Sequence, residues 1–135
     1  MAVSYQHDRQ ELITGLIEVT YASMTSGTAY SALELPAGAI LLDGTYWVTT
    51  AFNSGSSDAV VVAFNGLTLL TDSDAQATVR TAFTMPTTSN PEYCFITAPT
   101  YITLTWTGAG TAATAGTIFM EARYAVKGRT AFSQG

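Results

Sequence analysis

The chain has 135 residues with only ten acidic and five basic side chains, which give a net charge of −5 and a pI near 4.5. Phosphate binding requires clustered lysine and arginine, so this balance argues against a direct nucleic-acid role. Charged residues make up 11% of the chain, against about a quarter in an average soluble domain. A β-rich chain with so few charges has few side chains that could prevent its strand edges from pairing with other chains. We therefore expect other subunits to cover much of its surface, as in an assembly component rather than an enzyme.

The length suits one domain, because a chain of this mass buries about two-thirds of its surface around one core. We expect a single domain over residues 1–135. Cys94 is the one cysteine, so no internal disulfide is expected. The start lacks the pattern of a signal peptide, and no apolar run approaches the roughly 20 residues of a membrane helix. We expect synthesis in a cytoplasm and no membrane partner.

Residues 1–11 are polar and are expected to form an extended arm. Runs of apolar and β-branched residues then predict strands at 12–22, 32–35, 39–42, 46–52, 59–64, 67–70, 77–85 and 93–97. Residues that tolerate positive φ angles predict tight turns at 36–38, 43–44 and 65–66. Longer loops are expected at 53–58, 85–91 and 108–116.

The last two predicted strands show the clearest alternation. In 101–107, one face carries Ile102, Leu104 and Trp106. In 117–126, Glu121 and Arg123 lie on the face opposite the apolar one, which predicts a row facing solvent or an interface. Residues 127–135 are again polar and are expected to form a second arm. About eight or nine short strands of this kind predict an all-β, antiparallel sandwich or barrel.

No catalytic constellation stands out. His7 is the single histidine and lies in the expected N-terminal arm, where a serine–histidine–aspartate triad would not be held rigidly. With one histidine and one cysteine, the usual zinc sites are excluded. Asp72 and Asp74 could face a calcium ion from one side of a loop, but an ordinary acidic turn is the favoured interpretation. We expect no enzyme activity, no metal and no cofactor.

Four aromatic residues could form a sugar-stacking platform: Tyr46, Trp47, Tyr101 and Trp106. Aromatic residues in alternating strands more often belong to the core, which is the favoured interpretation here. Cys94 lies between Tyr93 and Phe95 and is expected to act as a small buried hydrophobe.

Two stretches of the chain resemble a known family. One comprises LPAGA at 35–39 with YWVTTAFNSGSSD at 46–58, and the other comprises ITLTWTGAGTAATAG at 102–116 with ARYAV at 122–126. Together they resemble head decoration, cement or minor capsid proteins of tailed bacteriophages. The resemblance spans residues 35–126, and its specific parts are structural turns rather than active-site motifs.

The resemblance implies a jelly-roll-like sandwich on the outside of an icosahedral phage head, where it would bridge neighbouring major capsid subunits. Its partners would be the major capsid protein and further copies of itself, with a dimer favoured over a trimer. The two arms and the charged row predict the interface, with Tyr5 and Phe132 as aromatic anchors. The candidate interface residues are Tyr5, His7, Asp8, Arg9, Glu121, Arg123, Lys127, Arg129 and Phe132.

Two alternatives stay open. The chain could be a carbohydrate-binding jelly roll of a head fibre or receptor-binding protein, which would need exposed aromatic residues around one concave site. It could also be a neck or tail component of the virion, which only its position in the particle would decide.

Overall fold

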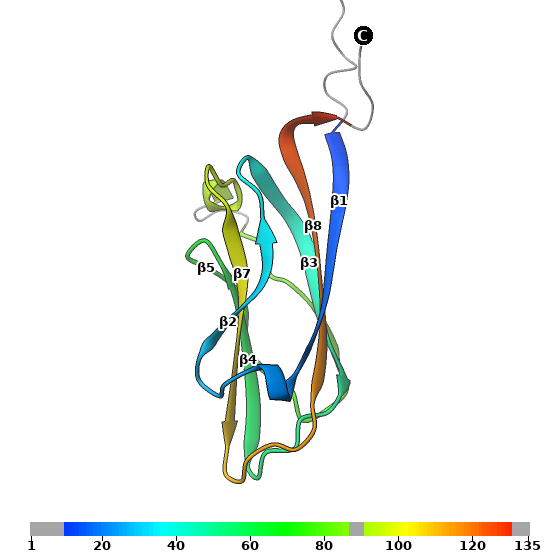
Figure 1. The fold of residues 1–135 in the computed structure, drawn as a ribbon, viewed down its shortest axis with the longest axis vertical. Helices are drawn as coiled ribbons and strands as arrows, with labels where there is room; N and C mark the ends of the chain where they lie inside the picture. The colour runs from blue at the N-terminus through cyan, green and yellow to red at the C-terminus, as the bar shows by residue number, and fades with distance from the viewer. Residues whose placement is uncertain (1–9, 87–90, 131–135) are drawn as a thin grey trace, which may run out of the picture.

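The computed structural model describes residues 10–86 and 91–130, and these form two antiparallel four-stranded sheets packed face to face (Figure 1). The strands are β1 (Gln10–Thr20), β2 (Ala29–Leu35), β3 (Ala39–Thr50), β4 (Ser57–Phe64), β5 (Leu67–Asp74), β6 (Arg80–Ala82), β7 (Thr100–Ala109) and β8 (Thr117–Thr130). Two short 3-10 helices, η2 (Tyr21–Ser23) and η3 (Pro91–Cys94), lie between strands. The described residues contain no helix long and apolar enough to cross a membrane.

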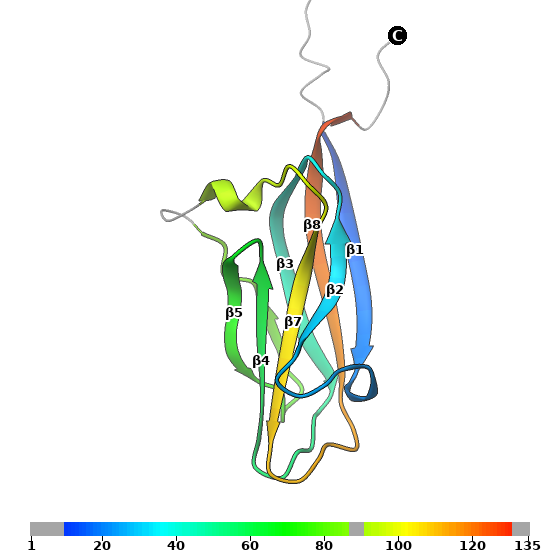
Figure 2. The same cartoon turned by 60° about the vertical axis from the view of Figure 1, so that its left-hand side comes forward.

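The strand order identifies the sandwich as a jelly roll. One sheet has the order β1-β8-β3-β6 and the other has the order β2-β7-β4-β5, so every connection crosses between the sheets except the β4–β5 hairpin, as in two Greek keys wound into a jelly roll. Figure 2 shows the two layers from a second direction, with β7 and β8 running through the middle of the molecule. The predicted β-sandwich of eight or nine strands is confirmed.

The core lies between the sheets and is built by period-two alternation. β4 alternates buried and half-buried residues from Asp58 to Phe64, and β7 does the same around Ile102, Leu104 and Trp106. The largest fully buried side chains come from both sheets and from the loop after β3: Tyr46, Phe52, Phe64, Leu35, Leu69, Ile102, Leu104, Ile118 and Met120. The inward faces expected for the last two strands are confirmed.

Two of the three predicted tight turns are present. Asn65 and Gly66 have φ angles of 51° and 84° and join β4 to β5 as a two-residue hairpin. Gly38, with φ 84°, completes the turn between β2 and β3.

The third predicted turn is wrong, because β3 runs unbroken through Asp43 and Gly44. A register shift between Leu41 and Asp43 places an extra residue in the strand, so the chain bulges instead of reversing. A Cβ at Gly44 would lie 2.4 Å from the Phe83 ring and 2.5 Å from the carbonyl oxygen of Glu121. Close packing therefore requires this glycine.

Other predicted boundaries also shift. The first strand ends at Thr20, where η2 follows, and the strand expected at 77–85 is reduced to Arg80–Ala82. The strand expected at 93–97 is wrong, because Pro91–Cys94 form η3 and only Phe95 makes an isolated bridge, to Ile40. Proline cannot donate a ladder hydrogen bond but suits the start of a helical turn.

The first and last strands extend into the segments expected to be arms. Gln10 pairs with Thr130, so the ladder between β1 and β8 continues to the end of the sandwich where both strands lead to the termini (Figure 1). The rest of the expected arms, at 1–9 and 131–135, lies outside the described residues.

Candidate functional site

The two segments that carry the family resemblance are neighbours in space. The loop between β3 and β4 and the loop between β7 and β8 meet at the lower end of the sandwich in Figure 1. The backbone N–H groups of Gly55 and Ser56 donate to the carbonyl oxygens of Thr111 and Ala109, at 3.0 and 2.8 Å. Segments about 50 residues apart thus form one unit.

Asn53 provides the side-chain link between these loops. Its Oδ1 accepts hydrogen bonds from the backbone N–H groups of Thr114 (2.7 Å) and Ala115 (3.0 Å). Its Nδ2 donates to the hydroxyl oxygen of Thr114 at 2.8 Å. One amide side chain therefore fixes the uncharged loop that leads into β8.

Asp58 is the buried polar centre behind the loops, with only 2% of its surface exposed. Its Oδ1 accepts from the indole N–H of Trp106 at 2.7 Å. Its Oδ2 accepts from the backbone N–H of Ser54 at 2.9 Å and from Nε2 of Gln76 at 3.0 Å. A carboxylate suits this position because it accepts at both oxygens and donates at neither.

The same contacts control the ionisation of Asp58. Burial opposes the charged form, but hydrogen bonds from Ser54, Gln76 and Trp106 outweigh burial and hold the pKa of Asp58 below its ordinary value. The carboxylate is fully engaged with protein donors, so its arrangement is that of a structural brace.

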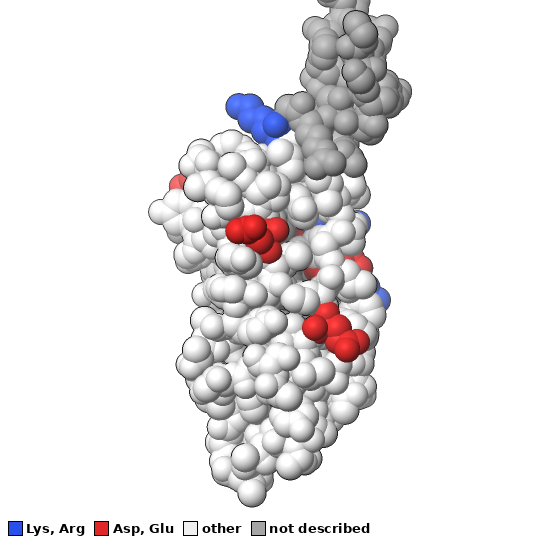
Figure 3. All heavy atoms as spheres, viewed as in Figure 1, with Lys and Arg blue, Asp and Glu red and all other residues white. Residues whose placement is uncertain are grey.

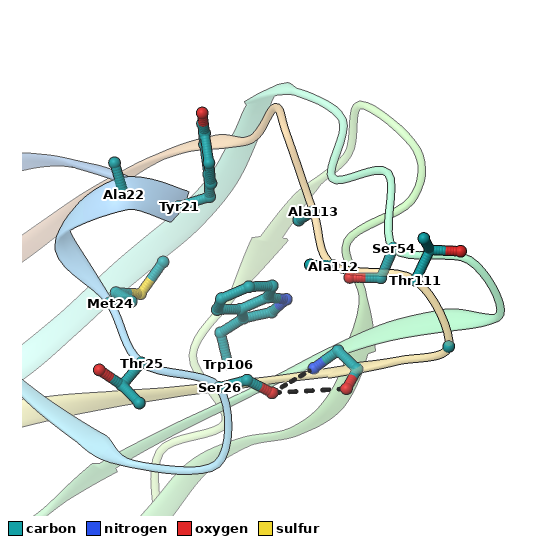
Figure 4. A pocket seen from close by; sticks show the side chains of 12 residues that line it. Tyr21, Ala22, Met24, Thr25, Ser26, Ser54, Trp106, Thr111, Ala112 and Ala113 are labelled. Atoms are coloured by element: carbon teal, nitrogen blue, oxygen red, sulfur yellow. Dashed lines mark hydrogen bonds between the residues drawn. The ribbon is translucent and has the colours of Figure 1, made fainter.

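A groove opens beside this brace, and Figure 4 shows the Trp106 indole at its centre. Its volume is about 390 Å³. It is lined by Tyr21, Ala22, Met24, Thr25, Ser26, Ser54, Trp106, Gly108, Gly110, Thr111, Ala112 and Ala113. The hydroxyl of Ser26 accepts from the backbone N–H of Gly108 at 2.9 Å and closes one side. We call this the Trp106 groove.

The Trp106 groove has no charged lining residue. Figure 3 likewise shows no charged side chain at the lower end of the face it presents. Within the described part of the chain, no three histidine, cysteine, aspartate or glutamate residues gather as a metal site would require. The groove presents a concave surface with hydroxyl groups and apolar area. These properties suit binding rather than acid–base chemistry.

The second candidate surface is the outer face of the β1-β8-β3 sheet. Leu12 and Leu16 on β1 are 54% and 62% exposed, and Leu42 on β3 is 47% exposed. The register places Leu16 beside Glu121 of β8 and Leu12 beside Ala125. We call this surface the leucine face.

The charged row predicted on β8 lies on the leucine face. Arg123 forms a two-pronged ion pair with Asp43 of β3, and its Nε donates to Asp43 Oδ1 at 2.6 Å. This hydrogen-bonded carboxylate raises the pKa of Arg123. Glu121 is half-buried next to it. The pair occupies a cross-strand position, and both of its members remain more than 40% exposed.

The other predicted interface residues are dispersed or lie outside the described structure. Lys127 is exposed, with its ammonium group 5.9 Å from the centre of the Phe95 ring. The backbone of Arg129 lies in β8. The remaining predicted interface residues are outside the described ranges: Tyr5, His7, Asp8, Arg9 and Phe132.

The predicted alternative of a four-residue aromatic platform is wrong. Tyr46 and Trp106 are buried in the core, at 0% and 6% exposure. Trp47 is half-buried, with the Arg80 guanidinium 4.8 Å from its ring centre, and Tyr101 is exposed on the other sheet. Neighbouring residues of one strand point to opposite faces, so Tyr46 and Trp47 cannot share a platform.

The two remaining candidates from the sequence also have structural explanations. Asp72 and Asp74 lie in β5 and not in the expected loop, and the carboxylate of Asp74 accepts the backbone N–H of Gln76 at 2.8 Å where the strand ends. Cys94 is half-buried against the core, and burial raises the pKa of its thiol. Sequence reasoning missed Asp58 and the two exposed leucines of β1.

Comparisons with known proteins add a shared fold. No family model and no curated protein sequence matches the chain. A chain of the acid-stable capsid structure of Helicobacter pylori bacteriophage KHP30 is 15% identical with a TM-score of 0.55, over 87% of this chain and 94% of that one. A chain of the capsid asymmetric unit of cyanophage Pam1 is 13% identical with a TM-score of 0.60, over 93% and 92%. At the level of fold, the resemblance to phage head proteins is confirmed.

Proposed function

We propose that this protein is a non-enzymatic structural component of a tailed-phage virion, acting as a single domain that cements the outside of the head. The observation that carries the proposal is the jelly roll shared with chains of two phage capsids over at least 87% of each chain compared. Fold alone does not determine function, so the proposal also draws on the surfaces described above.

Two features of the described residues support a cementing role. The leucine face and the Trp106 groove leave apolar area exposed in a chain with few charges, which is typical of surfaces covered in an assembly. The fully buried acid among the described residues, Asp58, accepts hydrogen bonds from groups of this chain and braces the loops. Many copies that bind only the assembled shell stabilise it by mass action.

A pelleting assay tests the proposal. Purified protein is mixed with assembled heads that lack it, and the bound copies are counted by quantitative mass spectrometry. Saturation at a fixed ratio to the major capsid protein supports cement, and heads carrying the protein should withstand heating better than bare heads. Absence from the head pellet, or binding to isolated tails instead, overturns the head assignment.

Variants then show which surface meets the shell. Ala113→Arg introduces a charge into the Trp106 groove, and Leu42→Lys introduces one on the leucine face at the centre of its sheet. If the shell covers one of these surfaces, only the variant on that surface loses binding, because a desolvated unpaired charge opposes association. Glycan-array binding by the wild-type protein, in place of head binding, would instead support the carbohydrate-binding alternative.

A further inference from the structure

β1 differs from the other three strands at the sheet edges. β6 has three residues, while β2 and β5 contain register shifts that interrupt their ladders. Short or bulged edges resist pairing with foreign strands. β1 pairs with β8 without a shift from Leu12 to Thr20, so its edge is long and regular.

The free side of β1 carries few of the usual guards, and Glu18 is the one charged residue between Leu12 and Thr20. The strand QELITGLIEVT contains no lysine and no proline. Between Leu12 and Val19, the described backbone makes no hydrogen bond beyond its ladder with β8. Unpaired N–H and C=O groups along such an edge form a template for another strand.

The outward side chains of β1 indicate which strand fits there. Leu12, Thr14, Leu16 and Glu18 are exposed and share one face. The two leucines lie symmetrically about Thr14. A second β1 strand that runs antiparallel about a twofold axis at Thr14 would therefore place Leu12 of each copy opposite Leu16 of the other.

We propose that β1 is a self-pairing edge, through which two copies join their β1-β8-β3-β6 sheets into one continuous eight-stranded sheet. The twofold axis passes through the pair formed by Thr14 and its counterpart. Two leucine pairs and one threonine pair then cover the edge side of the leucine face. Cross-strand pairs of these types stabilise antiparallel sheets.

Other registers fit less well. A twofold axis at Gly15 would oppose Leu12 to Glu18, and one at Leu16 would leave Leu12 opposite Thr20. Sliding one β1 strand along the other by an odd number of residues would turn the leucines of one copy to the inner face, because side chains alternate with period two. The Thr14 register is the one that pairs all four leucines of the dimer, which is why the second strand is another copy of this chain.

Disulfide trapping tests the register directly. In a Cys94→Ala background, Thr14→Cys should yield a dimer on a non-reducing gel after mild oxidation. Opposed residues in antiparallel strands have Cα atoms about 4.5–5.5 Å apart, within the range a disulfide spans. Glu18→Cys is the matched control, since eight residue steps, or about 26 Å, would separate the two cysteines. A monomeric Thr14→Cys variant, or equal cross-linking at both positions, would overturn the register.

Light scattering tests the dimer without cross-linking. The wild-type protein should have twice the monomer mass, and Leu16→Lys should have the monomer mass while keeping a β-rich circular dichroism spectrum. Leu42 is exposed on β3, away from the edge, so the Leu42→Lys variant should remain dimeric. A monomeric wild-type protein would overturn the proposal. The inference does not rest on attachment to a head, so a dimer that fails to bind heads contradicts only the proposed function.

Discussion

Asp58 is the residue on which the lower end of the sandwich depends most. It receives hydrogen bonds from the backbone of Ser54, the amide of Gln76 and the indole of Trp106. Gly108 lies against this cluster, where an added Cβ would meet Ser54 Oγ at 2.4 Å. The conformation of both loops is thus coupled to one buried charge.

Asp58→Ala should lower the free energy of unfolding by about 3 kcal/mol, because each buried donor left without an acceptor costs about 1–3 kcal/mol. Asp58→Asn should also destabilise, since its NH₂ group must face a donor in either orientation. Asp74→Ala is the control, because Asp74 is exposed and accepts one backbone N–H. Urea unfolding measures all three; equal losses for Asp58→Ala and Asp74→Ala would contradict the brace.

Asp58 should also make stability depend on acidity. Its pKa is lower in the folded chain than its ordinary value, which is about 3.9 for an unfolded aspartate. Its contribution is therefore complete above that value and is lost as the pH falls through the folded pKa. Urea unfolding between pH 6 and about pH 3 should show a steeper loss for the wild type than for Asp58→Asn. If the free energy of unfolding fell equally with pH in both proteins, Asp58 would not be the source of the acid sensitivity.

At the scale of elements, the alternating strands were predictable and the interrupted ones were not. β7 and β8 followed from apolar residues at every second position, and the Asn65-Gly66 hairpin followed from its turn residues. Asp43-Gly44 has the same turn chemistry, yet pairing with β8 and the hydrogen bond from the Phe83 N–H to the Gly44 carbonyl oxygen hold it in a bulged strand. Local sequence cannot show which partners a strand will find.

The candidate site was likewise only partly predictable from the sequence. The sequence stretches around Asn53 and Trp106 were recognisable, but nothing local indicated that they would meet. Asp58 and Gln76 contact each other only because β4 and the segment after β5 lie side by side. The exposed leucines of β1 alternate as core residues do, and only the packing of Ile17 and Val19 against the core shows that the leucines face outward.

The two joined loops should lose order locally when Asn53 is changed. Asn53→Ala removes the acceptor for the amides of Thr114 and Ala115, so their hydrogen exchange should speed up several-fold while exchange at Met120 stays slow. Asn53→Asp keeps that acceptor oxygen and should preserve most of the protection. Uniformly faster exchange would indicate global destabilisation instead of a local link.

At the scale of the whole molecule, charge is sparse and unevenly placed. The lining of the Trp106 groove is uncharged, and the ion pair of the leucine face joins Arg123 to Asp43 within the same chain. A shell contact made by either surface would therefore be dominated by apolar area. Salt that screens charges weakens such contacts little, whereas it weakens contacts between charged patches strongly.

Attachment to heads should consequently survive high salt. Raising sodium chloride from about 0.1 M to about 1 M shortens the screening length from about 10 Å to about 3 Å, which would release a protein held by surface charges. For this chain, the number of bound copies in the pelleting assay should change less than twofold. Arg123→Ala should bind heads as the wild type does, because its partner is internal. Strong release by salt would mean that the shell contacts charges beyond these two surfaces, and the polar chain ends would then become the segments to test.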